Sequence, residues 1–132
     1  MSSSAPHTAA RVARPASPQA RISRLELADY QRLSRRTAQY PRSDWLAYPA
    51  LGLAGEAGEV AEHAKKAIRD DAGAVTEQRR AALAAELGDV LWYTAQLASE
   101  LDLALEEIAQ ANLDKLASRQ RRGVLSGSGD DR

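Results

Sequence analysis

Two pairs of acidic residues in this chain have the spacing of paired metal ligands. Glu56 and Glu59 form the first pair, and Glu86 and Asp89 form the second, with 26 residues between the pairs. Side chains three residues apart lie on the same side of a helix, about one turn from each other. Four carboxylates from two neighbouring helices repel one another unless a cation lies between them. Because such a site offers only oxygen ligands, it favours a hard divalent ion, Mg²⁺ or, as a substitute, Mn²⁺.

The elements that must position these acids are helices. Helical periodicity predicts four of them, at about 26–40, 49–69, 77–100 and 104–122. Pro49 suits the first turn of the second helix, Thr76 the N-cap of the third, and Asp102 the N-cap of the fourth. Gly123 suits the C-terminal closure of the last helix. Four helices with short links, and no useful strand-period alternation, predict an all-α, four-helix bundle-like fold.

Within these helices the acids border the apolar stripes. At about 100° per residue, the first acidic pair shares a flank with His63, and the second pair shares a flank with Tyr93. On the fourth helix three polar residues share a flank: Asn112, Lys115 and Arg119. A cleft with acids from two helices and cations from a third would hold a metal–phosphate complex. Lys66, near the Glu59 side of the second helix, is a further candidate for binding phosphate.

Each of these features also has an ordinary structural interpretation. A single acidic pair in a helix usually lies on a solvent-exposed face. Two pairs on consecutive helices weaken that interpretation. Gly52, Gly55 and Gly58 are interleaved with the first pair, and each costs about 1 kcal/mol of helix propensity relative to Ala. These glycines indicate either close helix packing or room for a ligand beside the backbone, and the two are compatible.

The composition restricts the class of protein. A chain of 132 residues suffices for one domain with a modest core. Because cysteine is absent, disulfides and thiolate metal sites are excluded, which fits a reducing compartment. No apolar run approaches the roughly 20 residues that span a bilayer. We therefore expect a soluble, cytoplasmic protein without a membrane partner.

The charge is distributed unevenly along the chain. Residues 1–24 contain four arginines, no acid and many Ser, Ala and Pro residues, which predicts a disordered basic tail. A transit peptide shares this composition and stays open as an alternative. The rest of the chain has 14 basic and 18 acidic side chains, a poor match for nucleic acid. The helical domain is assigned to 25–123, and the Gly- and Ser-rich residues 124–132 to a flexible tail.

Longer stretches of the sequence resemble a known family. YPALGLAGEAGEVAEHAKKAIRD, then ELGDVLWY, then IAQANLDKLASRQRRGVLSGSGD are similar to the MazG-type nucleoside triphosphate pyrophosphohydrolases of the all-α NTP pyrophosphatase superfamily. The resemblance covers about 26–132, and ExxE followed by ExxD is its signature. It implies Mg²⁺-dependent hydrolysis of (d)NTPs to (d)NMP and pyrophosphate, often to remove non-canonical nucleotides. It also implies a helical module that forms dimers or tetramers, which a thin core without Phe favours as well.

The resemblance also implies roles for individual residues. The four acids would be metal ligands, and Glu59 or Glu56 the general base. Lys115 and Arg119 match basic positions that contact phosphate, with Asn112 a weaker match. Complementing the helix dipole is the alternative role of the two cations. Tyr93, one turn beyond the second acidic pair, is placed to contact substrate by its ring or hydroxyl.

Two positions depart from the family pattern. Gly55 stands where some members carry an additional Glu that is proposed to activate water, and His63 stands where relatives often have Lys. The first departure gives some support to an alternative, a non-catalytic nucleotide-binding or helical assembly module. A carboxylate-bridged di-iron bundle is disfavoured, because it requires Glu-x-x-His motifs and the sequence has none.

Overall fold

The structure is a computed structural model that describes residues 24–126. Its α-helices are α1 (Leu27–Ser34), α2 (Ala47–Asp70), α3 (Glu77–Glu100) and α4 (Leu105–Arg121). Two short 3₁₀ turns, η1 (Arg35–Thr37) and η2 (Arg42–Asp44), connect α1 to α2. No strand occurs within 24–126. The prediction of an all-α fold with four helices is therefore confirmed.

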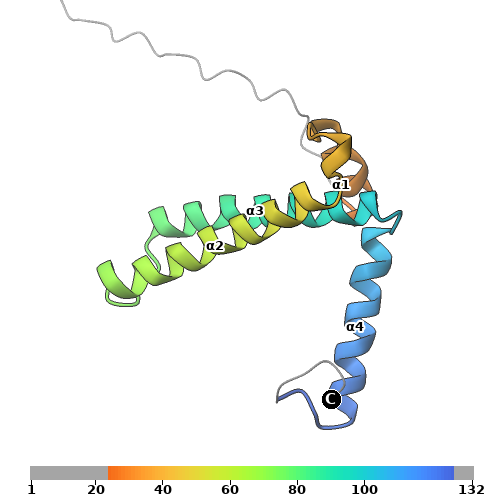
Figure 1. The fold of residues 1–132 in the computed structure, drawn as a ribbon. Helices are drawn as coiled ribbons and strands as arrows, with labels where there is room; N and C mark the ends of the chain where they lie inside the picture. Colours follow the sequence, from red (N-terminus) through yellow and green to blue (C-terminus); the bar gives the residue numbers. More distant parts are fainter. Residues whose placement is uncertain (1–23, 127–132) are drawn as a thin grey trace, which may run out of the picture.

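Helices α2 and α3 form a long antiparallel hairpin, the largest element of the molecule (Figure 1). The turn between them contains Ala72 and Gly73 at φ values of 53° and 83°. Asp71 holds the turn against α3, since Arg79 Nε donates to its Oδ2 at 2.5 Å. The backbone N–H of Arg79 donates to Oγ1 of Thr76 at 3.2 Å. Thr76 is therefore the N-cap of α3, as the sequence predicts.

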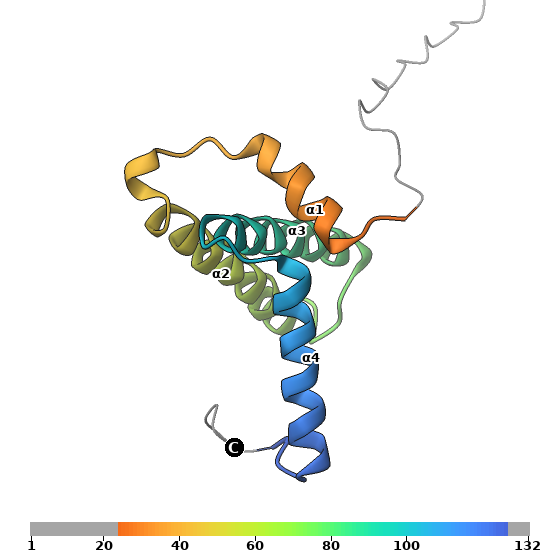
Figure 2. The same cartoon turned by 90° about the vertical axis from the view of Figure 1, so that its right-hand side faces the viewer.

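Helix α1 crosses the end of α3 (Figure 2) and is shorter than the sequence predicts. The sequence indicates a helix over 26–40, but α1 ends at Ser34 and continues only as the 3₁₀ turn η1. Pro41 disfavours a helical conformation for the residue before it. The chain then runs without regular structure to η2 and α2.

A polar network holds this connector against α3. The hydroxyl of Tyr40 donates to Oε1 of Glu100 at 2.6 Å, and Arg35 forms an ion pair with the same carboxylate. Arg35 also donates to the Tyr40 hydroxyl at 2.5 Å and to Oε1 of the fully buried Gln96 at 3.1 Å. Hydrogen bonds from Tyr40 and then from Arg35 lower the pKa of Glu100. We call these three residues the Arg35–Tyr40–Glu100 network.

The start of α4 is fixed by a side chain from α1. Gln31 Oε1 accepts the backbone N–H of Leu105 at 2.8 Å, and its Nε2 donates to the carbonyl of Leu103 at 2.9 Å. The predicted cap by Asp102 is wrong: this residue lies in the α3–α4 turn at φ 56°, and α4 has no N-cap side-chain bond of its own. Beside this junction lies the small core of Ala95, Ala98 and Leu105.

Helix α4 projects away from the α2–α3 hairpin (Figures 1 and 2). It contacts α1 and α3 near its start, and its Leu113 is 60% exposed. One chain therefore does not close into the bundle that the sequence predicts, because apolar side chains of α4 beyond its start, Ile108, Leu113 and Leu116, stay exposed. Gly123, at φ 70°, ends the helix, and the N–H of Val124 donates to the carbonyl of Arg119 at 3.0 Å. This is the predicted glycine closure.

Some predictions fall outside the described residues. The tail predicted over 1–24 lies almost wholly in residues 1–23, and most of the tail predicted over 124–132 lies in residues 127–132, neither of which is described. Both tails stay predictions. Among the residues that are described, no helix has the length and apolar character needed to cross a membrane.

Candidate metal centre

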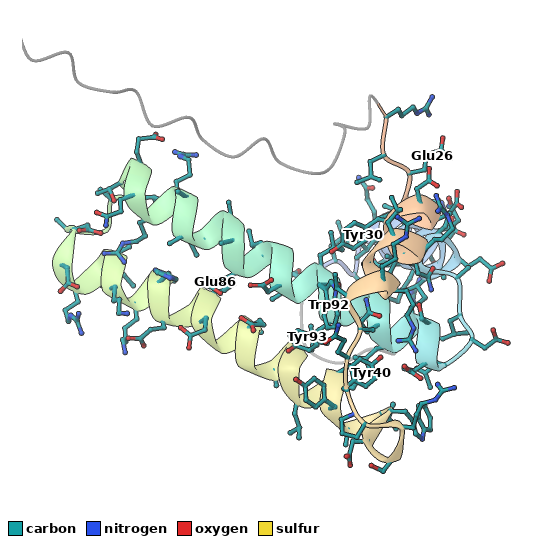
Figure 3. The ribbon with its side chains drawn as sticks, turned by 90° about the horizontal axis from the view of Figure 1, so that it is seen from above. Glu26, Tyr30, Tyr40, Glu86, Trp92 and Tyr93 are labelled. Atoms are coloured by element: carbon teal, nitrogen blue, oxygen red, sulfur yellow. The ribbon has the colours of Figure 1, made fainter. Side chains whose placement is uncertain are left out.

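Three acidic side chains meet where α2 and α3 pack together. One carboxylate oxygen from each of Glu56, Glu86 and Asp89 lies within 4.8 Å of the others. Figure 3 shows Glu86 between the two helices of the hairpin. The antiparallel pairing brings residue 56 of α2 opposite the turn of α3 that carries residues 86 and 89. We call Glu56, Glu86 and Asp89 the acidic cluster.

Glu59 is not part of the acidic cluster. It is exposed and follows Glu56 by about one turn of α2. The three acids of the cluster offer oxygens within a common 4.8 Å limit, and no oxygen of Glu59 does so. The structure therefore brings together three of the four predicted ligands and leaves the fourth beside them, facing solvent.

The electrostatics of the cluster fit a cation. Partial burial, followed by the negative charges of Asp89 and Glu86, raises the pKa of Glu56. Such a shift is expected where carboxylates crowd together without a compensating positive group. Oxygens bound to one Mg²⁺ lie roughly 3–4 Å apart, so small side-chain rotations would close the 4.8 Å cluster around an ion. An all-oxygen donor set suits Mg²⁺ and Mn²⁺.

The ring of Tyr93 lies beside the acidic cluster and packs against the backbone of Gly52. A Cβ atom at position 52 would overlap the Tyr93 ring. Burial, the neighbouring Tyr48, and then Glu56 and Asp89 raise the pKa of Tyr93. Figure 3 shows its ring near the end of the hairpin that α1 crosses. The close approach predicted for the glycines of α2 therefore holds at position 52.

The other two glycines of α2 border open space. A Cβ atom added at Gly55 or Gly58 would have no atom of another part of the described chain within 4 Å. Its neighbours would be the adjacent residues and the backbone of α2 itself. Close helix packing does not explain these two positions within one chain. Room for a ligand, or for a second subunit, stays the interpretation for both.

The remaining substrate-binding candidates lie away from the cluster. Asn112 and Lys115 are exposed on α4, and Arg119, 5% exposed, lies on the same helix. Because α4 projects away from the hairpin, the described chain does not bring these residues to the acidic cluster (Figure 1). Lys66 Nζ lies 3.6 Å from Glu62 Oε1 on the surface of α2. Their substrate-binding roles stay predictions.

Two further side chains interact with acids of the cluster: His63, which the sequence placed on their flank, and Tyr30, which it did not. His63 Nε2 lies 3.7 Å from Glu86 Oε1, a contact indicated only by the position of His63 on the acidic flank of α2. Tyr30 of α1 packs against the small core, and burial, followed by the charge of Asp89, raises its pKa. No sequence pattern placed Tyr30 near the acids, because α1 crosses α3 by tertiary packing alone.

A surface hollow of about 580 Å³ lies elsewhere, between α1 and the α3–α4 turn. Its lining includes Gln31, Ser99 and Glu107, and it contains none of the acidic cluster. Gln31 and Ser99 already bond to each other at 3.1 Å. The hollow is therefore a feature of the helix junction and not part of the candidate metal centre.

Comparisons with known proteins agree with the geometry. Residues 49–124, more than half of the chain, match the model of the MazG nucleotide pyrophosphohydrolase domain. The chain is 50% identical over 109 residues to the Gene 37 protein of Mycobacterium phage L5, an alignment that covers 78% of this chain and 96% of that protein. No solved structure matches the chain.

Proposed function

Because the chain belongs to the MazG nucleotide pyrophosphohydrolase family, we propose that it hydrolyses (d)NTPs between the α- and β-phosphates. The products are (d)NMP and pyrophosphate, and the reaction depends on Mg²⁺, for which Mn²⁺ can substitute. Removal of unwanted nucleotides from the cellular pool is the role that fits this reaction. The acidic cluster is the observation that carries the proposal, since a triphosphate would not approach three carboxylates without a cation.

Glu56, Glu86 and Asp89 would hold the divalent ion. The bound ion supplies positive charge that offsets the charge of the triphosphate and of the leaving pyrophosphate. The three side chains themselves fix where that charge lies, because they are carried by two packed helices and not by loops. Tyr93, whose ring is held on Gly52 beside the cluster, would contact the substrate next to the ion.

Glu59 is the general base in this proposal. It is exposed and adjacent to the cluster without belonging to it, so its carboxylate is available to accept a proton. A water attacks the α-phosphorus, Glu59 takes its proton, and the bond from the α-phosphorus to the bridging oxygen breaks. The electron pair leaves with pyrophosphate. Glu59 then compensates for the absence of an acid at Gly55, while Glu56, the alternative base, serves as a ligand.

Self-association forms part of the proposal. Large apolar side chains lie exposed on three helices: Leu51 and Ile68 at 74%, Leu113 at 60% and Leu87 at 55%. A chain with so small a core and so much exposed apolar surface gains stability by covering it with a second copy. We expect a dimer or tetramer, and light scattering that found only a 14.3 kDa species would contradict it.

The position of α4 indicates how the cations would reach the phosphates. Lys115 and Arg119 lie on a helix that leaves its own hairpin (Figure 1), so α4 of one subunit would serve the acidic cluster of another. Mixing Asp89→Ala with Lys115→Ala subunits tests this arrangement. If α4 acts across subunits, a mixed dimer regains one intact site and about half of the wild-type rate. If each chain completes its own site, mixing restores nothing.

The function itself is tested with a panel of nucleotides. The eight common NTPs and dNTPs, together with oxidised analogues, are incubated with Mg²⁺, and release of pyrophosphate is separated from release of orthophosphate. Asp89→Ala and Glu59→Ala should each lower the rate by about 100-fold or more, and rates within a few-fold of wild type would contradict the site. Calorimetric binding of a nucleotide without turnover would instead favour the non-catalytic module, for which Gly55 is the specific observation.

A further inference from the structure

His63 contacts the acidic cluster from outside it. This residue follows Glu59 by about one turn of α2, and its Nε2 lies 3.7 Å from Oε1 of Glu86. Both side chains are largely buried, with 20% and 22% of their surfaces exposed. The other ring nitrogen, Nδ1, is buried without a hydrogen-bond partner in the described chain. A buried polar atom of this kind calls for an explanation.

The surroundings decide which nitrogen of the neutral ring carries the proton. A proton on Nδ1 would bury an N–H group that has no acceptor, and would aim the Nε2 lone pair at the Glu86 carboxylate. A proton on Nε2 aims an N–H donor at that carboxylate, which is favourable. The second tautomer therefore fits the site. At 3.7 Å the hydrogen bond is not yet formed, and a small rotation of either side chain would form it.

We propose that His63 is a positioning residue for the metal ligand Glu86. Its Nε2–H holds the Glu86 carboxylate in the orientation that offers an oxygen to the cluster with Glu56 and Asp89. Ligands of metal ions are commonly oriented by such outer contacts, and losing one typically weakens metal binding 10–100-fold. The inference rests on the proposed function, because it assumes that the acidic cluster binds a divalent ion.

Neighbouring charges do not compete for this contact. Glu62, the acid next to His63 in the sequence, forms an ion pair with Lys65, and its Oε1 lies 3.6 Å from Lys66 Nζ. Glu59, one turn before His63, is exposed. Glu86 is therefore the carboxylate that His63 faces across the α2–α3 packing.

Three substitutions of His63 separate a hydrogen-bond role from a packing role. Gln places an amide N–H close to the position of Nε2, Asn reaches only the position of Nδ1, and Leu fills the space without a donor. Mn²⁺ binding to wild type and to each variant is measured by electron paramagnetic resonance at one common pH, and circular dichroism checks that each variant is folded. We expect His63→Leu and His63→Asn to bind Mn²⁺ about 10-fold or more weakly, and His63→Gln to stay within about threefold of wild type.

The outcomes distinguish this inference from the proposed function. Equal Mn²⁺ affinity of wild type and His63→Leu would overturn the role of His63 and leave the metal centre intact. An equal loss in the Gln, Asn and Leu variants would also overturn it, since the donor would not matter. Failure of the wild-type protein to bind Mn²⁺ would overturn the metal centre itself, and with it this inference.

Discussion

Helix α3 carries carboxylates in two opposite environments. Toward its end, Glu100 accepts hydrogen bonds from Tyr40 and Arg35, and its pKa is lowered. Toward its middle, Glu86 and Asp89 face Glu56 of α2, whose pKa is raised. The first carboxylate stabilises the fold because the chain supplies its partners. The second group has His63 beside Glu86, and a bound cation would supply the compensating charge, which is the behaviour expected of a binding site.

Removing a carboxylate from the acidic cluster should have the largest effect. Glu86→Gln keeps the size of the side chain but removes a charged metal ligand, so the rate of pyrophosphate release should fall by about 100-fold or more. The metal-free protein should melt at the wild-type temperature or above, because a repulsive contact is lost. A rate close to wild type, measured at saturating Mg²⁺, would show that the cluster does not bind the catalytic ion.

The same substitution in the Arg35–Tyr40–Glu100 network should act on stability instead. Glu100→Gln leaves the partly buried Arg35 without its counter-charge, which should cost about 1–3 kcal/mol of unfolding free energy. Urea denaturation measures that cost, and a pyrophosphate assay on the folded fraction measures activity. We expect a rate per folded molecule within about twofold of wild type. A loss of activity as large as that of Glu86→Gln would contradict the assignment of Glu100 to stability and of Glu86 to activity.

A smaller change in the network sharpens the comparison. Tyr40→Phe removes the hydrogen bond that Tyr40 donates to Glu100 and the one that it accepts from Arg35. It keeps the stacking of this ring on Tyr48, whose centroid is 5.2 Å away. The expected loss is about 1 kcal/mol of unfolding free energy, with unchanged activity. A loss as large as that of Glu100→Gln would mean that Tyr40, and not Arg35, dominates the network.

The dependence of stability on pH should differ in sign between the two environments. The lowered pKa of Glu100 gives stability that is present above its ordinary value of 4.5 and is lost as the pH falls through the lowered pKa. The raised pKa of Glu56 has the opposite effect, so metal-free protein loses stability as the pH rises from 4.5 through the raised pKa. The effect at Glu56 is the smaller of the two, because its partly exposed carboxylate is screened by solvent.

Denaturation of metal-free wild type, Glu56→Gln and Glu100→Gln between about pH 3 and 8 checks both signs. The stability of the Glu56→Gln variant relative to wild type should increase as the pH rises toward neutrality. The loss of stability caused by Glu100→Gln should become smaller as the pH falls. Parallel curves for all three proteins would contradict both assignments.

Local sequence signals were sufficient for much of the fold. Thr76 caps α3 and Gly123 closes α4 as predicted, because each signal depends on residues within a few positions. The spacing of the acids likewise predicted that α2 and α3 would share a cluster. These features follow from helix geometry, which neighbouring residues largely determine.

The deviations arise where distant parts of the chain meet. Just after the end of α1, Arg35 and Tyr40 bond to Glu100, which lies 65 and 60 positions away from them in the sequence. Gln31 replaces the predicted cap of α4 and so helps to set where that helix starts. Glu59 lies outside the cluster because the rotation of α2 against α3 is set by packing, which the three-residue spacing does not determine.

The ring of Tyr93 on the backbone of Gly52 has an evolutionary consequence. The two positions cannot vary independently, because any side chain at 52 needs the volume that the ring at 93 fills. Relatives that retain an aromatic residue at 93 should retain glycine at 52, and those with Ala or Ser at 52 should carry a smaller residue at 93. Coupled variation at these positions would therefore show whether a relative keeps the same packing of an aromatic ring on glycine beside its carboxylates.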